Sequence, residues 1–154
     1  MREMNVGGRV LEVVRGDITL IPTDALVNAA NSHLIPGGGV DGAIHRAGGP
    51  AILADLRSRY GERRHCPTGD AGVTIAGDLP ALWVIHAVGP VWAGGRRGEP
   101  ELLASAYRAS LAHADALGAT TVTFPAISCG IFGYPLPEGA RVALETVRAH
   151  LADG

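Results

Sequence analysis

The sequence contains no lysine, and all 13 of its basic residues are arginine. This absence excludes Schiff-base chemistry through a lysine amine and excludes a P-loop, whose lysine reaches the phosphates of a nucleotide. The two cysteines, Cys66 and Cys129, are too few for a disulfide framework, which agrees with a reducing compartment. No apolar run reaches the roughly 18 residues of a membrane helix, and the N-terminal segment lacks the apolar core of a signal peptide. We therefore expect a cytoplasmic protein with no membrane partner.

Size and charge indicate one folded domain. A chain of 154 residues with 47% hydrophobic residues can bury a substantial core, and we expect a single domain over residues 1–154. The net charge of −2 gives no electrostatic support for wrapping nucleic acid. Glycine is more frequent than average, at 22 residues, and indicates many tight loops between regular elements.

Short apolar runs alternate with segments of helical spacing along the chain. The apolar runs predict strands over residues 10–14, 25–30, 72–76, 82–88 and 122–127, of which 82–88 is expected to be central. Helical spacing with glycine or proline boundaries predicts helices over 41–47, from Pro50, over 102–117 and from about Pro137. Residues 93–100, rich in glycine and arginine, predict a mobile surface loop. The alternation predicts an α/β layered domain with a largely parallel sheet.

Polar or glycine-rich loops follow three of the predicted strands. Asp17, residues 28–41 and residues 128–132 each come directly after an apolar run. Because open α/β sheets bind ligands at the carboxyl ends of their strands, we expect these loops to converge on one cleft.

Two of these loops contain glycine runs, Gly37-Gly38-Gly39 and residues 129–133. Glycine leaves backbone N–H groups uncovered, and a helix N-terminus after the first run adds partial positive charge, so the two loops suit the two halves of a pyrophosphate. Tight connections between elements would produce glycine runs as well, and that alternative stays open. Neither run matches a P-loop or a dinucleotide fingerprint, so an ATPase and a nicotinamide-dependent enzyme are poorly supported.

Three polar residues flank these loops, and each has two interpretations. Asp17 either accepts a hydrogen bond from the exocyclic amine of adenine or caps the turn that follows it. Asn31 either contacts sugar hydroxyls or serves its own turn. Asp41 either positions a water molecule or is the N-cap of the following helix.

Other candidates for metal binding or nucleophilic catalysis give weak signals. His86 lies inside an apolar strand and is interpreted as a hydrogen-bonded core histidine. His65, Cys66 and Cys129 do not have zinc spacing, so we expect no metal and no cofactor. The pair Ser128-Cys129, next to a glycine loop, could be mistaken for a catalytic nucleophile. We interpret both as small residues that let the backbone reach phosphate.

Five motifs follow one another along most of the chain. They are Gly16-Asp17-Ile18-Thr19, Asn28-Ala29-Ala30-Asn31, residues 37–45, residues 84–90 and residues 125–133. Together they resemble a macrodomain of the MacroD type. The resemblance implies a three-layer α/β/α sandwich around a mixed, mostly parallel sheet, with the whole chain forming one macrodomain.

The resemblance also implies a hydrolase that binds ADP-ribose, and we expect it to act without a metal. Such domains remove mono-ADP-ribose from Asp and Glu side chains of proteins and deacetylate O-acetyl-ADP-ribose. The position matching Asp17 holds the adenine amine, the two glycine loops wrap the diphosphate, and the aromatic matching Phe132 packs on the distal ribose. The expected catalytic residues are Asn31 and Asp41. The expected ADP-ribose-binding residues are Asp17, Ile18, Asn28, Gly37, Gly38, Gly39, Val40, Ser128, Cys129, Gly130, Ile131 and Phe132.

We expect Asn31 to fix the ribose hydroxyls and Asp41 to orient or deprotonate a water molecule. The expected partners are ADP-ribose and mono-ADP-ribosylated proteins, and we expect a monomer. Two alternatives remain: a non-catalytic ADP-ribose reader, and a hydrolase of other ADP-ribose conjugates such as ADP-ribosylated nucleic-acid ends. Pro36 departs from the family, which usually has glycine there, and proline stiffens the loop entrance and removes one N–H donor.

Overall fold

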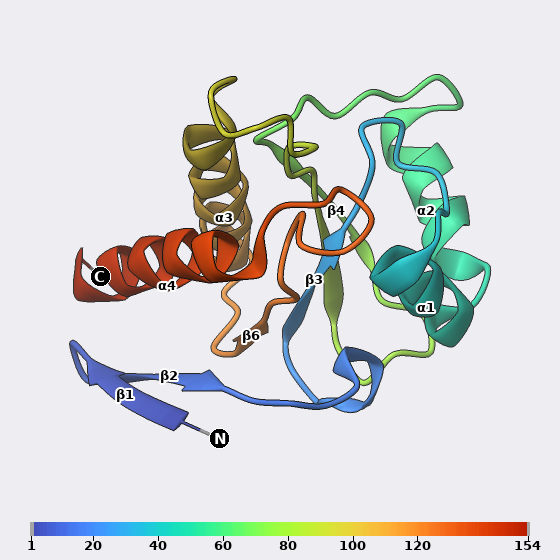
Figure 1. The fold of residues 1–154 in the computed structure, drawn as a ribbon. Coiled ribbons are helices and arrows are strands. Elements are labelled where there is room, and N and C mark those ends of the chain that lie inside the picture. The colour runs from blue at the N-terminus through green and yellow to red at the C-terminus, as the bar shows by residue number, and fades with distance from the viewer. Residues whose placement is uncertain (1, 154) are drawn as a thin grey trace.

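A four-stranded sheet with the order β4-β5-β3-β6 forms the centre of the molecule (Figure 1). The structure is a computed structural model that describes residues 2–153. The strands are β3 (Ala25–Ala29), β4 (Ala71–Ile75), β5 (Trp83–Ala87) and β6 (Val122–Thr123). β3 is parallel to β5 and to β6, whereas β4 is antiparallel to β5. The sheet is therefore mixed and mostly parallel, as predicted, and β5 is an inner strand.

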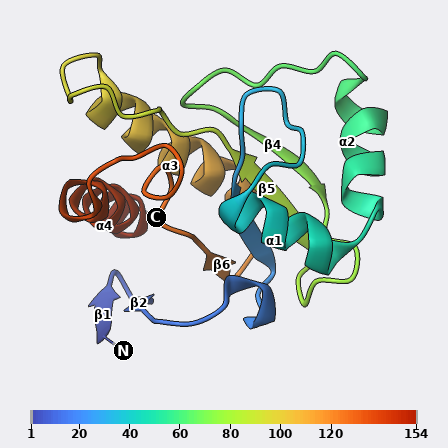
Figure 2. The ribbon, with the colours of Figure 1, turned by 45° about the vertical axis from the view of Figure 1, so that its right-hand side comes forward.

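Two helices cover each face of the sheet (Figure 2). α1 (Gly39–Gly48) and α2 (Ala51–Tyr60) lie on one side, and α3 (Glu99–Ala116) and α4 (Leu136–Asp153) lie on the other. Side chains alternate along β3, so Leu26 packs with the core under α1 and α2 while Val27 packs with the core under α3 and α4. This arrangement confirms the predicted three-layer α/β/α sandwich.

Glycines follow both helices on the first face; α1 ends within one residue of the predicted end at residue 47, whereas no end was predicted for α2. Gly49 and Gly61 have φ of 78° and 84°, a conformation that glycine adopts without a steric penalty, and their N–H groups bond the carbonyls of His45 and Arg57. The short connection through Pro50 places α2 directly after α1. The first helix begins two residues before the predicted start, because Gly39 and Val40 already belong to α1.

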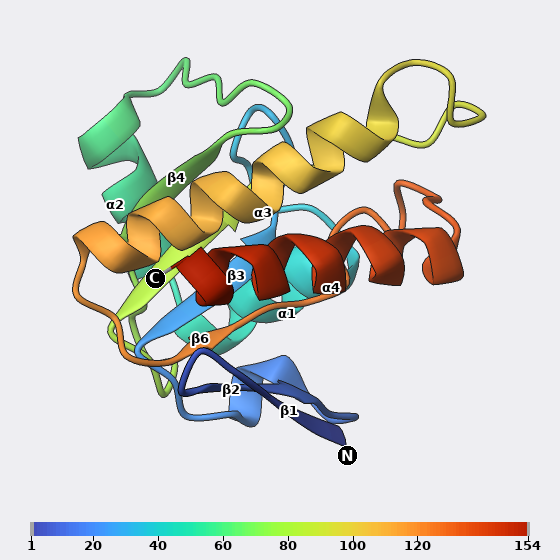
Figure 3. The same ribbon diagram turned by 90° about the vertical axis from the view of Figure 1, so that its left-hand side faces the viewer.

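An N-terminal hairpin lies apart from the main sheet (Figure 3). β1 (Arg2–Val6) pairs with β2 (Arg9–Val13) in antiparallel register, and neither strand bonds to the four-stranded sheet. Most hairpin residues are exposed, whereas Val6 is buried and Arg9 donates to the carbonyl oxygen of Leu151 at 3.3 Å. The sequence predicted β2 but not β1.

The segment 93–98 is organised by Glu99, the first residue of α3. The buried Glu99 carboxylate accepts hydrogen bonds from the N–H groups of Ala93, Gly95 and Arg97 at 2.6–2.9 Å. Burial opposes its charge, but the backbone donors outweigh that effect and lower the pKa of Glu99 to about 2. Glu99 and Pro100, predicted as loop, are therefore the start of the helix. Within residues 2–153, no helix is long and apolar enough to cross a membrane.

Candidate functional site

A cavity of about 460 Å³ opens at the carboxyl ends of β3 and β5. Its wall consists of residues 29–31, 37–41, 89, 125–132 and 136. Two of the three loops predicted to converge, 28–41 and 128–132, therefore meet at this cavity. The third, at Asp17, does not line it.

The first glycine loop and the start of α1 present backbone donors to the cavity. The N–H groups of Gly38, Gly39 and Val40 have no hydrogen-bond acceptor among the described residues, as is usual for the first turn of a helix. Gly39 has a φ of 58°, which favours glycine at this position. The N–H group of Gly37 is already used, because it donates to Asp41 Oδ2 at 2.8 Å. The anion-binding capacity of this loop thus lies from Gly38 onward.

The second glycine loop forms the opposite wall. The N–H groups of Ser128, Gly130, Ile131 and Phe132 bond no acceptor within the described part of the chain. Ser128 has a φ of 67°, an uncommon conformation for a residue with a side chain, and such strain is concentrated at functional sites. Ile131 is 76% exposed and leans toward the first loop, where a Cβ on Gly38 would lie 3.2 Å from Ile131 Cδ1. The two loops therefore approach each other across the mouth of the cavity.

Gly89, which follows β5, lets the second loop pack against the sheet. A Cβ at this position would overlap the side chain of Ser128 and lie 2.6 Å from Ile127 Cγ2. Gly89 was not among the predicted site residues. The signal that could have found it is a glycine immediately after the predicted strand 82–88.

Asp41 is the buried carboxylate of the cavity wall, with 5% of its surface exposed. It is the third residue of α1 and not its N-cap, because Gly38 occupies that position. Its Oδ1 accepts from Asn28 Nδ2 at 2.7 Å and lies 3.4 Å from His45 Nε2. Burial acts to raise the pKa of Asp41, but the donors His45, Asn28 and Gly37 together lower it below its usual range. The carboxylate is therefore ionised at neutral pH and fixed in orientation.

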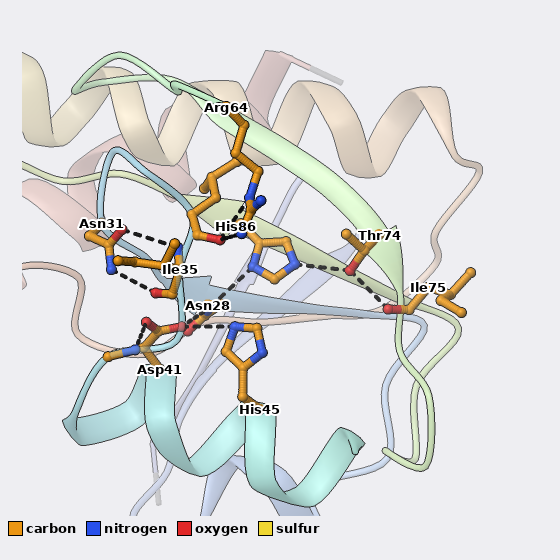
Figure 4. Close-up of polar contacts among 11 residues, drawn as sticks. Asn28, Asn31, Ile35, Asp41, His45, Arg64, Thr74, Ile75 and His86 are labelled. Atoms are coloured by element: carbon orange, nitrogen blue, oxygen red, sulfur yellow. Dashed lines mark hydrogen bonds and ion pairs between the residues drawn. The ribbon is translucent and has the colours of Figure 1, made fainter. Parts of the chain in front are cut away.

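A chain of buried polar groups extends from Asp41 across the sheet (Figure 4). Asn28 Nδ2 also lies 3.2 Å from His86 Nδ1, and His86 Nε2 lies 2.9 Å from Thr74 Oγ1. All three side chains are buried. Burial, reinforced by His45, lowers the pKa of His86 to about 3, so the ring is neutral at physiological pH. The prediction of a hydrogen-bonded core histidine is confirmed.

Asn31 lines the cavity and also organises the loop that follows β3. Its Nδ2 donates to the Ile35 carbonyl at 2.8 Å, and its Oδ1 accepts from the Ile35 N–H at 3.3 Å. Leu34, inside this turn, has a φ of 52°. The Leu34 carbonyl accepts two hydrogen bonds from the buried guanidinium of Arg64, at 2.9 and 3.0 Å. No sequence pattern distinguishes Arg64 from its neighbour Arg63.

Neither candidate nucleophile of the second loop is activated. Burial raises the pKa of the Cys129 thiol and keeps it protonated. Ser128 Oγ is buried and has no hydrogen-bond partner among the described residues, so no base holds it. Across residues 2–153, no three His, Cys, Asp or Glu side chains gather as a metal site would require. The charged side chain on the cavity wall is the Asp41 carboxylate.

The structure separates the predicted binding residues into two groups. Gly37 to Val40 and Ser128 to Phe132 lie on the cavity wall, together with both predicted catalytic residues. Asp17, Ile18 and Asn28 do not. Asp17 caps a short 3-10 helix, η1 (Ile18–Leu20), by accepting from Thr19 N–H at 3.0 Å, which is the turn-capping interpretation of this residue.

Comparison with known proteins places this geometry in a family. The Macro domain profile matches residues 27–143. A Cronobacter sakazakii protein named O-acetyl-ADP-ribose deacetylase is 56% identical over 146 residues, which are 95% of this chain and 81% of the relative. The Oceanobacillus iheyensis macrodomain with ADP superposes with a TM-score of 0.93 at 40% identity, covering 99% of this chain and 82% of that one. The Trypanosoma brucei macrodomain in complex with ADP-ribose superposes with a TM-score of 0.80 at 41% identity, over 91% of this chain and 56% of that one. The chain belongs to the Macro domain family.

Proposed function

We propose that this protein binds ADP-ribose and hydrolyses ester conjugates at its distal ribose, including mono-ADP-ribosylated Asp and Glu side chains and O-acetyl-ADP-ribose. The observation that carries the proposal is a buried, ionised carboxylate, Asp41, at a cavity walled by the free N–H groups of two glycine loops. The name of the Cronobacter relative and the ADP-ribose in the Trypanosoma macrodomain support the same ligand.

The diphosphate is the part of the ligand that the two loops suit best. Gly38 to Val40 offer N–H groups at the N-terminus of α1, where the helix dipole favours negative charge, and residues 128–132 offer further donors from the other side. Backbone N–H groups suit this task in a chain without lysine, because binding through them does not require a flexible side chain to become ordered.

Asp41 is assigned the role of holding the attacking water. Its two oxygens are already oriented by Gly37 and Asn28, so the carboxylate can accept a hydrogen bond from water in a fixed direction. A lowered pKa makes it a weak base, which favours orientation of the water over complete removal of its proton. Asn31 is assigned to the ribose, on the same wall.

The test is ADP-ribose release from a Glu-linked mono-ADP-ribosylated protein, with O-acetyl-ADP-ribose as a second substrate. We expect Asp41→Ala to lower kcat by about 10²–10⁴-fold, the contribution of a positioned acid–base group, with the Kd for ADP-ribose within about threefold of wild type. Asp115→Ala is the matched control, because Asp115 pairs with His150 away from the cavity.

Other results would identify a different function. Binding of ADP-ribose without release from either ester would make the protein a reader, or assign it to another linkage such as an ADP-ribosylated nucleic-acid end. Equal losses of binding and rate in Asp41→Ala would make Asp41 a structural residue of the loop.

A further inference from the structure

Three buried side chains lie next to one another on three adjacent strands behind the cavity. Asn28 on β3 is paired in register with His86 on β5, and Thr74 lies on β4 beside it. All three point toward the face that α1 covers, and Figure 4 shows the line of contacts from Asp41 on α1 to Ile75 on β4. Each of the three is at most 1% exposed. None of them lines the cavity, so their connection to it runs through Asp41.

The hydrogen-bond donors in this line can be assigned from one end. The ionised Asp41 accepts only, so the Asn28 group at 2.7 Å from its Oδ1 must be the amide NH₂. The same nitrogen lies 3.2 Å from His86 Nδ1, within reach of its second hydrogen. His86 Nδ1 must therefore be the unprotonated, accepting nitrogen of the ring.

The other end of the line agrees with this assignment. With Nδ1 unprotonated, a neutral His86 carries its proton on Nε2 and donates to Thr74 Oγ1 at 2.9 Å. The Thr74 hydroxyl in turn donates to the Ile75 carbonyl at 2.9 Å. Every donor thus meets an acceptor. The opposite tautomer would place an N–H of His86 against the NH₂ of Asn28 and leave Thr74 without its donor.

We propose that His86, held by Thr74 in its Nε2–H tautomer, is a positioning residue that orients the Asn28 amide and, through it, the Asp41 carboxylate. The hydrogen bonds run outward from the Asn28 amide nitrogen, to Asp41 on one side and through His86 and Thr74 to the Ile75 carbonyl on the other, so the Thr74 hydroxyl accepts from His86. The proposal rests on the proposed function for its effect on catalysis, but the tautomer itself is independent of any substrate.

The charges around His86 are compatible with a permanently neutral ring. Burial is the largest influence and lowers the pKa, His45 and Arg64 act in the same direction, and Asp41 and Asp55 act against them. The ring of His45 lies 6.1 Å from that of His86. The neutral state that the hydrogen-bond pattern requires is therefore the state that the surroundings favour.

The first experiment reads the tautomer directly. In protein labelled with ¹⁵N-histidine, long-range ¹H–¹⁵N spectra distinguish a protonated Nε2 from a protonated Nδ1, and comparison with His86→Gln assigns the signals. We expect His86 to be the Nε2–H tautomer in the wild type and in Thr74→Ser, which keeps the hydroxyl. Thr74→Val keeps the shape and loses the acceptor, so its His86 signals should move away from the pure Nε2–H pattern.

The second experiment follows the consequence at Asp41. In Thr74→Val, rotation of Asn28 should remove a donor from Asp41, so the Asp41 carboxyl should titrate closer to the usual value of about 4 in ¹³C spectra. The kcat for ADP-ribose release should fall about tenfold, as for loss of one buried hydrogen bond, while KM stays unchanged. Thr74→Ser should restore both. If Thr74→Val does not fold, Thr74→Ala removes the same acceptor and places no methyl group against the His86 Nε2–H.

The outcomes separate this proposal from the proposed function. An Nδ1–H tautomer in the wild type, or a Thr74→Val protein with unchanged His86 signals and unchanged Asp41 titration, would overturn it. A wild-type protein with the expected tautomer and Asp41 titration but no ADP-ribose release would overturn the proposed function alone. If Thr74→Ser, which keeps the hydroxyl, loses as much stability as Thr74→Val, the hydroxyl is not what Thr74 contributes. Thr74 would then be a packing residue, and the proposal would be overturned.

Discussion

At the scale of a single residue, Gly89 determines where the second glycine loop can lie. A methyl group there would overlap Ser128 and press on Ile127, so Gly89→Ala must displace the loop or strain it. We expect the free energy of unfolding to fall by about 1–3 kcal/mol, the usual cost of overpacking, and ADP-ribose binding to weaken about tenfold or more. Urea denaturation measures the first effect and calorimetry the second.

A matched glycine separates this steric effect from the general effect of replacing glycine by alanine. Gly16 has open space where its Cβ would be and no positive φ, so Gly16→Ala should leave stability and binding near wild type. Wild-type affinity in Gly89→Ala would mean that the 128–132 loop does not contact the ligand.

The sequence indicated which residues could line a site better than it indicated what each side chain bonds to. Gly38 and Asp41 were predicted at the cavity because a glycine run before a helix is a local pattern. The burial of Asn28 was not foreseen, because it depends on the register of β3 with β5, two strands about 60 residues apart in the chain, paired at Asn28 and His86. Arg64 was missed for the same reason, since its acceptor is the Leu34 carbonyl of another loop.

At the scale of whole elements, the apolar runs located the inner strands to within one or two residues. β3 and β5 are buried on both faces, so composition alone marks them. β6 is shorter than predicted because Pro125 has no N–H for a ladder and the chain turns there into the cavity wall. β1 was missed because four of its five residues are exposed and show no apolar alternation.

The hairpin of β1 and β2 should be the least protected regular element. Its amides bond only across one strand pair, and two-stranded hairpins have little stability of their own. We expect its slowest amides to exchange with deuterium at least about 100-fold faster than those of β3 and β5. Hydrogen exchange followed by mass spectrometry or NMR makes this measurement. Equal protection would show that contacts with the end of α4, such as Arg9 to Leu151, hold the hairpin as firmly as a sheet.

At the scale of the whole molecule, buried ionisable groups set the response to acid. Three of them, Asp41, His86 and Glu99, have their pKa lowered in the folded state. In each case the unfolded chain binds more protons as the pH falls, so each one makes the folded state less stable toward low pH. The pH ranges differ: the two carboxyls act only below their ordinary pKa values of about 4, whereas His86 acts from about 6.5 downward.

The loss of stability just below neutral pH should therefore depend on His86. Its folded pKa of about 3 lies below the unfolded value of about 6.5, so its contribution is complete above pH 6.5 and is lost as the pH falls toward 3. This one group should lower the free energy of unfolding by up to about 1.4 kcal/mol per pH unit between pH 6 and 4.5.

Urea denaturation at several pH values should show a smaller slope of unfolding free energy against pH in His86→Gln, whose side chain can still accept from Asn28 and donate to Thr74. His33→Gln, at an exposed position, should keep the wild-type slope. If His86→Gln also keeps the wild-type slope of unfolding free energy against pH, His86 is protonated in the folded protein over this range. The assignment of a neutral ring, on which the contacts with Asn28 and Thr74 depend, is then wrong.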